Sequence, residues 1–289
     1  MDTILQGRSK TVIIGAEQPF CIIGERINPT GRKKFAEELR GGDLSTVVGD
    51  TEAQMAAGAD VLDVNAGIPL VDEAELLASM LRLVQDTTDA PVCIDSSVIE
   101  ALDAGLAVYE GKPLVNSVTG EDDRLEEILP LVAKYGAAVI GLANDETGIP
   151  ETPQQRLEIA TKIVKVAGDH GIPPEDVLID PLAMTVGAAT DAVTITLETI
   201  RLIREHLGVN MSLGASNVSF GLPRRHELNA AFLPMAMAAG LTSAIMSTAQ
   251  ICVDEVRAAD LLLGHDPWGA QWIAEHRARK QAAEAVAAP

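Results

Sequence analysis

Short apolar runs alternate with longer segments of helical periodicity along most of the chain. The runs are rich in Val, Ile and Leu, as buried strands are. They predict strands over residues 20–24, 61–64, 91–94, 114–115, 138–142, 177–179, 210–213 and 243–246. In the intervening segments apolar positions recur every three or four residues. This periodicity predicts helices over residues 43–57, 72–85, 98–109, 123–135, 153–170, 192–206, 227–239 and 252–263.

Eight strand–helix units in series predict an α/β fold, a single (β/α)8 TIM barrel with parallel strands. The alternative is an open, doubly wound sheet, which usually has fewer strands and often carries a G-x-G-x-x-G turn. The chain contains neither that motif nor a G-x-x-x-x-G-K-[ST] loop. We expect one domain over residues 1–289. Residues 1–18 would be an N-terminal extension, with 11–15 as a hairpin strand at the barrel floor, and residues 265–289 a C-terminal helical tail.

The charge balance argues against nucleic acids and membranes as partners. Acidic residues number 42 against 22 basic ones, which gives a formal net charge of −20. No cluster of Lys and Arg supplies the basic face that phosphates require. No apolar window is long enough to span a bilayer. The three cysteines, Cys21, Cys93 and Cys252, match no metal or redox spacing, and a disulfide framework is not expected. We therefore expect a cytoplasmic protein.

Short polar side chains follow nearly every predicted strand. Because the carboxyl ends of barrel strands open into one mouth, these side chains would converge there. A single Asn, Asp or Ser in such a place is typical of a turn or a helix cap. So many at successive strand ends indicate a binding site. The residues are Glu25, Arg26, Asn28, Asp63, Asn65, Asp95, Ser96, Ser97, Asn116, Ser117, Asn144, Asp145, Asp180, Ser216, Asn217 and Ser219.

The residue types at the strand ends favour an organic ligand over a metal ion. No His or Cys is among them, which disfavours zinc or iron. The five histidines lie on helices or loops without ligand spacing: His170, His206, His226, His265 and His276. The carboxylates leave a magnesium-dependent barrel lyase open as an alternative. Carboxylates mixed with amides fit a flat, neutral heterocycle better, because an ionised Asp accepts two parallel N–H bonds and Asn both donates and accepts.

Six strand-end motifs together resemble one family. They are IGERIN (23–28), VLDVN (61–65), CIDS (93–96), VNS (115–117), IDPL (179–182) and GASNVS (214–219). In this order they resemble the pterin-binding domain of methyltetrahydrofolate–corrinoid methyltransferases. That family includes stand-alone enzymes and the folate domain of cobalamin-dependent methionine synthase. The resemblance extends from about residue 22 to residue 263.

The resemblance implies roles for nine residues. Asp95, Asn116 and Asp180 would hold the pterin edge, and Asn217 would be the catalytic amide near N5, the nitrogen that carries the methyl group. The other members would line, support or close the folate pocket: Asp63, Asn65, Glu25, Asn28 and Arg225. No metal ligand is implied.

The resemblance also implies an SN2-like methyl transfer between N5 of tetrahydrofolate and the cobalt of a corrinoid, with the direction open. The cobalt-ligating D-x-H-x-x-G pattern is missing, so we expect the corrinoid (cobalamin) on a separate partner protein. A demethylase in the same system and a homodimer are further expectations. Two alternatives within the fold stay open. One is a dihydropteroate synthase-like enzyme, although its lysine and late Ser-x-Arg motif are not evident. The other is a non-catalytic folate-binding subunit.

Overall fold

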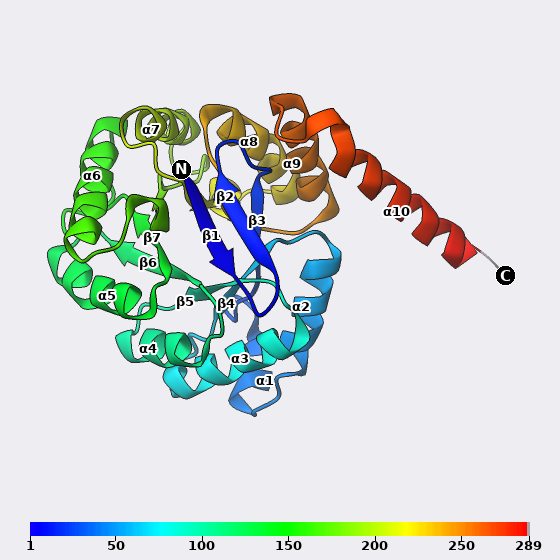
Figure 1. Cartoon of the computed structure of the whole chain (residues 1–289), viewed down its shortest axis with the longest axis horizontal. Helices are drawn as coiled ribbons and strands as arrows, with labels where there is room; N and C mark the ends of the chain where they lie inside the picture. Colours follow the sequence, from blue (N-terminus) through cyan, green and yellow to red (C-terminus); the bar gives the residue numbers. More distant parts are fainter. Residues whose placement is uncertain (288–289) are drawn as a thin grey trace.

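Eight parallel strands form the centre of the molecule in a nearly closed barrel (Figure 1). The computed structural model describes residues 1–287, with side chains described through residue 281. The strands pair in the order β8-β7-β6-β5-β4-β3-β10-β9. A parallel bridge between Ile179 and Met211 joins the two outer strands, and the Ile179 amide donates to the Asn210 carbonyl at 3.0 Å. The predicted TIM barrel is thus confirmed.

The barrel strands lie close to their predicted positions. They are β3 (Cys21–Ile27), β4 (Val61–Asn65), β5 (Val92–Asp95), β6 (Leu114–Thr119), β7 (Ala138–Leu142), β8 (Val177–Asp180), β9 (Ser212–Gly214) and β10 (Ser243–Met246). The helices that follow them and cover the barrel are α2 (Ser45–Ala56), α3 (Glu73–Thr87), α4 (Ile99–Val108), α5 (Asp122–Tyr135), α6 (Pro153–Asp169), α7 (Ala192–His206), α8 (Arg225–Ala239) and α9 (Gln250–Leu263).

One helix, α1 (Lys33–Arg40), was not predicted. Four of its eight residues are Lys, Arg or Glu on the solvent side, and only Phe35 and Leu39 are buried. Two apolar positions four residues apart form too short a stripe to stand out as a periodic pattern. The helix matters because it ends the loop that follows β3 at the barrel mouth.

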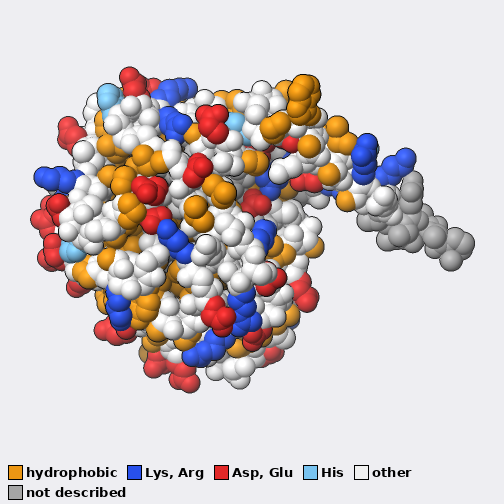
Figure 2. All heavy atoms as spheres, in the orientation of Figure 1, with side chains coloured by type: hydrophobic (Ala, Val, Ile, Leu, Met, Phe, Trp, Pro, Cys, Tyr) orange, Lys and Arg blue, Asp and Glu red, His pale blue; other side chains and the backbone are white. Residues whose placement is uncertain are grey.

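A two-stranded hairpin closes the floor of the barrel. The predicted strand over 11–15 is β2 (Thr11–Gly15), and it pairs with β1 (Asp2–Gln6), which was not predicted. Leu5 and Ile14 are fully buried in the interior cluster that the barrel strands form. Figure 1 looks onto this floor, and Figure 2 shows carboxylate side chains spread around its edge. The polar mouth therefore opens on the opposite end of the strands.

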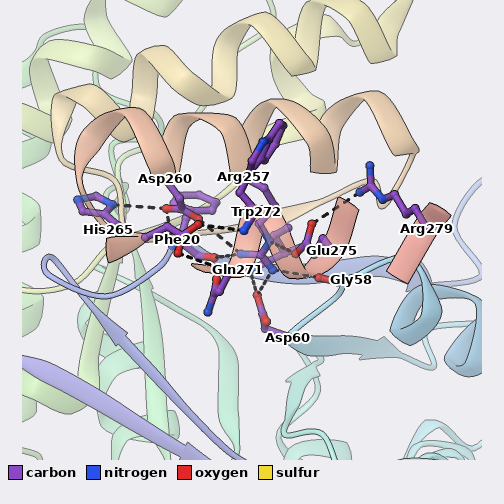
Figure 3. A network of polar contacts seen from close by, with 12 residues as sticks. Phe20, Gly58, Asp60, Arg257, Asp260, His265, Gln271, Trp272, Glu275 and Arg279 are labelled. Carbon is purple, nitrogen blue, oxygen red and sulfur yellow. Dashed lines mark hydrogen bonds and ion pairs between the residues drawn. The ribbon is translucent and has the colours of Figure 1, made fainter. Parts of the chain in front are cut away.

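The C-terminal helix α10 (Ala270–Ala287) projects away from the barrel (Figure 1). A buried arginine, Arg257 of α9, connects its first turns to the body of the molecule (Figure 3). Arg257 pairs with Asp60 at 3.1 Å and with Glu275 of α10 at 3.7 Å, and it donates to the Phe20 carbonyl at 3.0 Å. Within the predicted tail, the described part is helical from Ala270 to Ala287, and residues 288–289 lie outside the described residues.

Two further predictions concern cysteines and membrane spans. Cys21, Cys93 and Cys252 are free and buried, so no disulfide joins them. Within residues 1–287, no helix has the length and apolar character needed to cross a bilayer.

Candidate active site

A cavity of about 620 Å³ opens at the carboxyl ends of the barrel strands. This volume suits a drug-sized organic molecule. Of the nine predicted site residues, all except Asn65 line it: Glu25, Asn28, Asp63, Asp95, Asn116, Asp180, Asn217 and Arg225. They come from β3 and the loop after it, from β4, β5, β6 and β8, from the turn after β9 and from the first residue of α8. Side chains far apart in the sequence thus converge at one mouth.

Three neighbouring strands, β4, β5 and β6, together with β8 place an acid–amide cluster in this cavity, defined here as Asp63, Asp95, Asn116 and Asp180. In the sheet register Asn65 lies opposite Asp95, and Asp95 lies opposite Asn116. Asn65 lies behind the cavity wall and donates its Nδ2 to Asp95 Oδ2 at 3.0 Å. This bond fixes the Asp95 carboxylate at the end of β5.

The other two carboxylates of the cluster are fixed in the same way. Asn116 donates its Nδ2 to Asp63 Oδ1 at 3.1 Å, and Asp63 is only 2% exposed. The backbone amide of Leu182 donates to Asp180 Oδ1 at 2.7 Å. Asp180 stands at the end of β8, across the mouth from the β4–β6 side. The cluster therefore presents acceptors from both sides of the opening.

Desolvation raises the pKa of all three carboxyl groups of the cluster. It raises the pKa of Asp95 to about 6 and that of Asp180 to about 7. The pKa of Asp63 is raised well above its ordinary value by burial and by the charge of Asp95. Removal from water also raises the pKa of Glu25. A ligand that donates N–H groups would favour the ionised forms, because it replaces the lost water.

Asn217 lies in a short 3-10 turn, η2 (Ala215–Ser219), directly after β9. A Cβ at Gly214 would lie 3.0 Å from Asn217 Nδ2, so the glycine gives the amide its room over the strand end. The neighbouring Ser216 donates its hydroxyl to Glu25 Oε1 at 2.8 Å. This bond ties the β9 turn to the end of β3 across the mouth.

Arg225 is anchored at the rim by the same turn. It donates to the Ser216 carbonyl at 2.7 Å and to Ser219 Oγ at 3.2 Å. Its guanidinium carbon lies 5.7 Å from the centre of the exposed Phe220 ring. Asn28, on the opposite loop, accepts the Thr30 amide through Oδ1 at 2.9 Å. Both residues border the opening rather than its base.

Some strand-end residues do not reach the cavity. Asp145 accepts the amide and the hydroxyl of Thr147 in a local turn, and with Asn144 it lies outside the lining. Ser96 and Ser97 line a smaller neighbouring cavity instead. For Asp145 the contacts are those of a turn residue.

Several lining residues were not among the predicted set. His226 lies on a helix, as predicted, but α8 begins at Arg225 and its first turn brings His226 to the cavity wall. Gln54 comes from the last turn of α2, where no strand-end signal exists. The other additions are Arg26, Thr30, Arg32, Gly214, Ser216, Phe220, Ile245, Ser247 and Thr248. Of these, Arg26 and Ser216 had been noted at strand ends.

Among the described residues, no group of three or more His, Cys, Asp or Glu side chains is placed to hold a metal ion. The polar groups of the cavity are amides, hydroxyls, arginines, carboxylates and one imidazole. Such a set suits an organic ligand with several hydrogen-bonding edges.

Comparisons with solved structures place the fold among known barrels. The chain aligns with Yersinia pestis dihydropteroate synthase bound to a pterine–sulfa conjugate, with a TM-score of 0.68, 15% identity and coverage of 91% of this chain and 99% of that one. It aligns with Xanthomonas albilineans dihydropteroate synthase in complex with 7,8-dihydropteroate, with a TM-score of 0.68, 18% identity and coverage of 87% and 96%. At these identities the likeness concerns the fold.

Sequence comparisons identify relatives and a family. The chain is 33% identical over 254 residues to the methylcorrinoid:tetrahydrofolate methyltransferase of Eubacterium limosum, covering 86% of this chain and 92% of that protein. It is 36% identical over 246 residues to the methionine synthase of Mycobacterium tuberculosis, covering 80% of this chain and 20% of that protein. The chain thus spans about a fifth of that synthase. The pattern of the pterin binding enzyme family matches residues 24–247. The chain belongs to the pterin binding enzymes.

Proposed function

We propose that this protein is a methyltransferase that moves a methyl group between N5 of tetrahydrofolate and the cobalt of a corrinoid on a separate partner protein. One observation carries the proposal: the acid–amide cluster and Asn217 lie in the same cavity. The relative named methylcorrinoid:tetrahydrofolate methyltransferase, of which this chain covers 92%, supports it. The cavity volume of about 620 Å³ accommodates a folate and leaves it open to a second reactant.

The acid–amide cluster is suited to a pterin. The N–C–NH2 edge of the ring presents two parallel N–H donors, which an ionised Asp accepts as it would a guanidinium. In this proposal Asp180 and Asp95 take those donors, and Asn116 bonds a ring atom with its free oxygen. Asn65 and Asp63 act as positioning residues, because they hold Asp95 and Asn116 through the bonds described above. Binding would lower the pKa of Asp95 and Asp180.

The leaving group of this reaction is N5 of tetrahydrofolate, a tertiary amine before the methyl group is transferred. When the methyl group moves from tetrahydrofolate to cobalt, the N5–methyl bond breaks with its electron pair remaining on N5, which takes up a proton from solvent; the opposite direction reverses these steps. The reduced cobalt supplies the pair for the new bond to the methyl carbon. Asn217 would stabilise the protonated N5 by accepting its hydrogen through Oδ1, a bond that strengthens as charge develops. Glu25, Asn28 and Arg225 would fix the loops around this point.

We further propose that the enzyme works with a corrinoid protein and a substrate-specific demethylase, and returns methyl groups to tetrahydrofolate. The relative's name, with a methylcorrinoid before tetrahydrofolate, supports this direction. A homodimer and a cytoplasmic location are part of the same proposal.

The proposal is tested by mixing the purified protein with 5-methyltetrahydrofolate and free cob(I)alamin. The expected result is conversion of the cob(I)alamin absorbance to that of methylcobalamin, and the reverse reaction with methylcobalamin and tetrahydrofolate. A parallel assay supplies a dihydropterin diphosphate and p-aminobenzoate. Dihydropteroate formation without methyl transfer would contradict the proposal and favour a synthase. Tight folate binding without either reaction would favour a non-catalytic subunit.

A further inference from the structure

The amide proposed to stabilise N5, that of Asn217, depends on its neighbours for its position. The Asn217 side chain is exposed in the cavity, and among the described residues no hydrogen bond joins its amide to the protein. Its neighbours in η2, Ser216 and Ser219, are by contrast both hydrogen-bonded through their hydroxyls. The place of the amide over the cavity therefore depends on how firmly these two serines hold the turn.

A buried amide on the next helix contacts both serines. This residue, Asn229 of α8, is 3% exposed, and Ser219 is fully buried. Asn229 Oδ1 accepts the Ser219 hydroxyl at 2.7 Å, and Asn229 Nδ2 donates to Ser216 Oγ at 3.3 Å. One side chain thus spans the turn, with a hydrogen bond on each side of Asn217.

The direction of each hydrogen bond around Asn229 is fixed, because a serine hydroxyl has one proton to donate. Ser216 donates its proton to Glu25 Oε1 at 2.8 Å, so it can only accept from Asn229 Nδ2. Ser219 donates to Asn229 Oδ1, since the Ser216 carbonyl is more distant at 3.4 Å, and it accepts from Arg225 Nε at 3.2 Å. The two serines together need an acceptor on one side and a donor on the other, which a side-chain amide supplies.

We propose that Asn229 is a positioning residue, which holds the η2 turn so that Asn217 faces N5 of the substrate. The inference rests on the function given above, since it takes methyl transfer at N5 as the reaction. Asn229 does not line the cavity, so it acts through the turn and not by touching the folate. Such a role matters for the rate because a displacement of about 1 Å at a reacting group can cost about 100-fold.

A double-mutant cycle tests whether Asn229 acts through Asn217. Asn229→Ala should slow single-turnover methyl transfer from 5-methyltetrahydrofolate to cob(I)alamin by about tenfold or more, because it releases both serines. The affinity for 5-methyltetrahydrofolate, measured by calorimetric titration, should change little, because the acid–amide cluster holds the pterin edge. In an Asn217→Ala protein the same substitution should cause no further slowing, because the amide that Asn229 positions is gone.

A second variant keeps the size of the side chain. Asn229→Asp retains the acceptor for Ser219 but sets an acceptor against Ser216, whose single proton cannot serve this carboxylate and Glu25 together. The rate should fall as in Asn229→Ala, again with little change in affinity. The matched control is Met237→Ala, which removes a buried side chain about two turns further along α8. It should lower stability in urea but leave the rate per folded molecule at the wild-type value.

Three results would overturn the role of Asn229 and leave the proposed function standing. The first is equal slowing by Asn229→Ala with and without Asn217, because the two residues would then act independently. The second is a loss of folate affinity as large as the loss of rate, because Asn229 would then serve the whole cavity. The third is a wild-type rate in both Asn229 variants. If the wild-type protein transfers no methyl group, the proposed function itself falls, and the role of Asn229 with it.

Discussion

At the scale of single residues, the mouth is built from carboxylates that are each anchored by one amide. Asn65 holds Asp95, Asn116 holds Asp63, and the Leu182 backbone amide holds Asp180. Each of these carboxylates is desolvated, and burial raises its pKa. Such groups are unfavourable in the free protein and become favourable when a ligand donates to them.

Replacing Asn217 tests the proposed chemistry at N5. Asn217→Ala should lower the rate of methyl transfer by about 100-fold or more, the usual cost of losing one preorganised polar group. Folate affinity should fall much less, because the pterin edge is held elsewhere. Single-turnover absorbance of cobalamin measures the rate, and calorimetry measures the affinity. Unchanged turnover would remove Asn217 from the mechanism.

The carboxyl groups predict a pH dependence of folate binding. An ionised Asp accepts the pterin donors, so affinity should rise with pH as Asp95 and then Asp180 ionise, near pH 6 and 7, and level off above. Asp180→Asn should weaken binding and remove the upper part of this rise. The same substitution should not destabilise the free protein above pH 7, because it removes a desolvated charge. Titrations at several pH values and urea unfolding measure the two effects, and a pH-independent affinity would contradict the assignment.

The strand-end residues of the cavity could be predicted from the sequence, because the carboxyl ends of barrel strands open into one mouth whatever the details of packing. It did not predict Gln54, whose place depends on how closely α2 approaches Gly24. His226 was missed for a similar reason, since two extra residues at the start of α8 decide whether it faces the cavity. Asp145 was expected at the mouth but lies in a local turn, because a turn residue and a site residue cannot be distinguished by sequence alone.

At the scale of elements, the floor hairpin contributes to the stability of the fold, whereas the loops at the mouth carry the site residues. The hairpin buries Leu5 and Ile14 between the barrel strands, and Asn210 donates to Thr3 Oγ1 at 2.9 Å and to the Ile14 carbonyl at 2.8 Å. These contacts attach the first residues of the chain to the start of β9. The hairpin strand β1 has alternating buried and exposed positions, but five residues are too few to separate it from a loop.

A pair of hairpin substitutions tests this division. Leu5→Ala should lower the free energy of unfolding by about 2–5 kcal/mol, since it leaves a cavity in the barrel interior. Ile4→Ala, on the outer face of the same strand and 43% exposed, should change it by about 0.5 kcal/mol or less. Urea unfolding measures both, and the rate of methyl transfer per folded molecule should be unchanged in each. Equal losses of stability would contradict the described hairpin packing.

At the scale of the whole molecule, the acidic surface surrounds a mouth that carries several arginines. With a net charge of −20, the protein repels anionic polymers and attracts a partner with a basic patch. Its fold was predictable because eight repeated units leave few other architectures. The charge could not reveal the partner's identity, since surface charge bears on association and not on chemistry.

The salt dependence of KM should distinguish electrostatic docking of the partner protein from the methyl-transfer step itself. If a basic surface of the corrinoid protein docks on this acidic molecule, the KM for that protein should rise as the Debye length shortens from about 10 Å at 0.1 M salt towards about 3 Å at 1 M. The KM for free cobalamin should change much less. Steady-state kinetics with both forms measures the difference. Equal salt responses would argue against electrostatic docking.

The central claim is that the mouth of the barrel cradles a reduced pterin, and a crystal structure with 5-methyltetrahydrofolate tests it most directly. The account predicts the ring edge within hydrogen-bond distance of Asp95, Asn116 and Asp180, with N5 beside Asn217. Folate bound elsewhere on the molecule, or a pterin in the cavity with N5 turned away from Asn217, would contradict it.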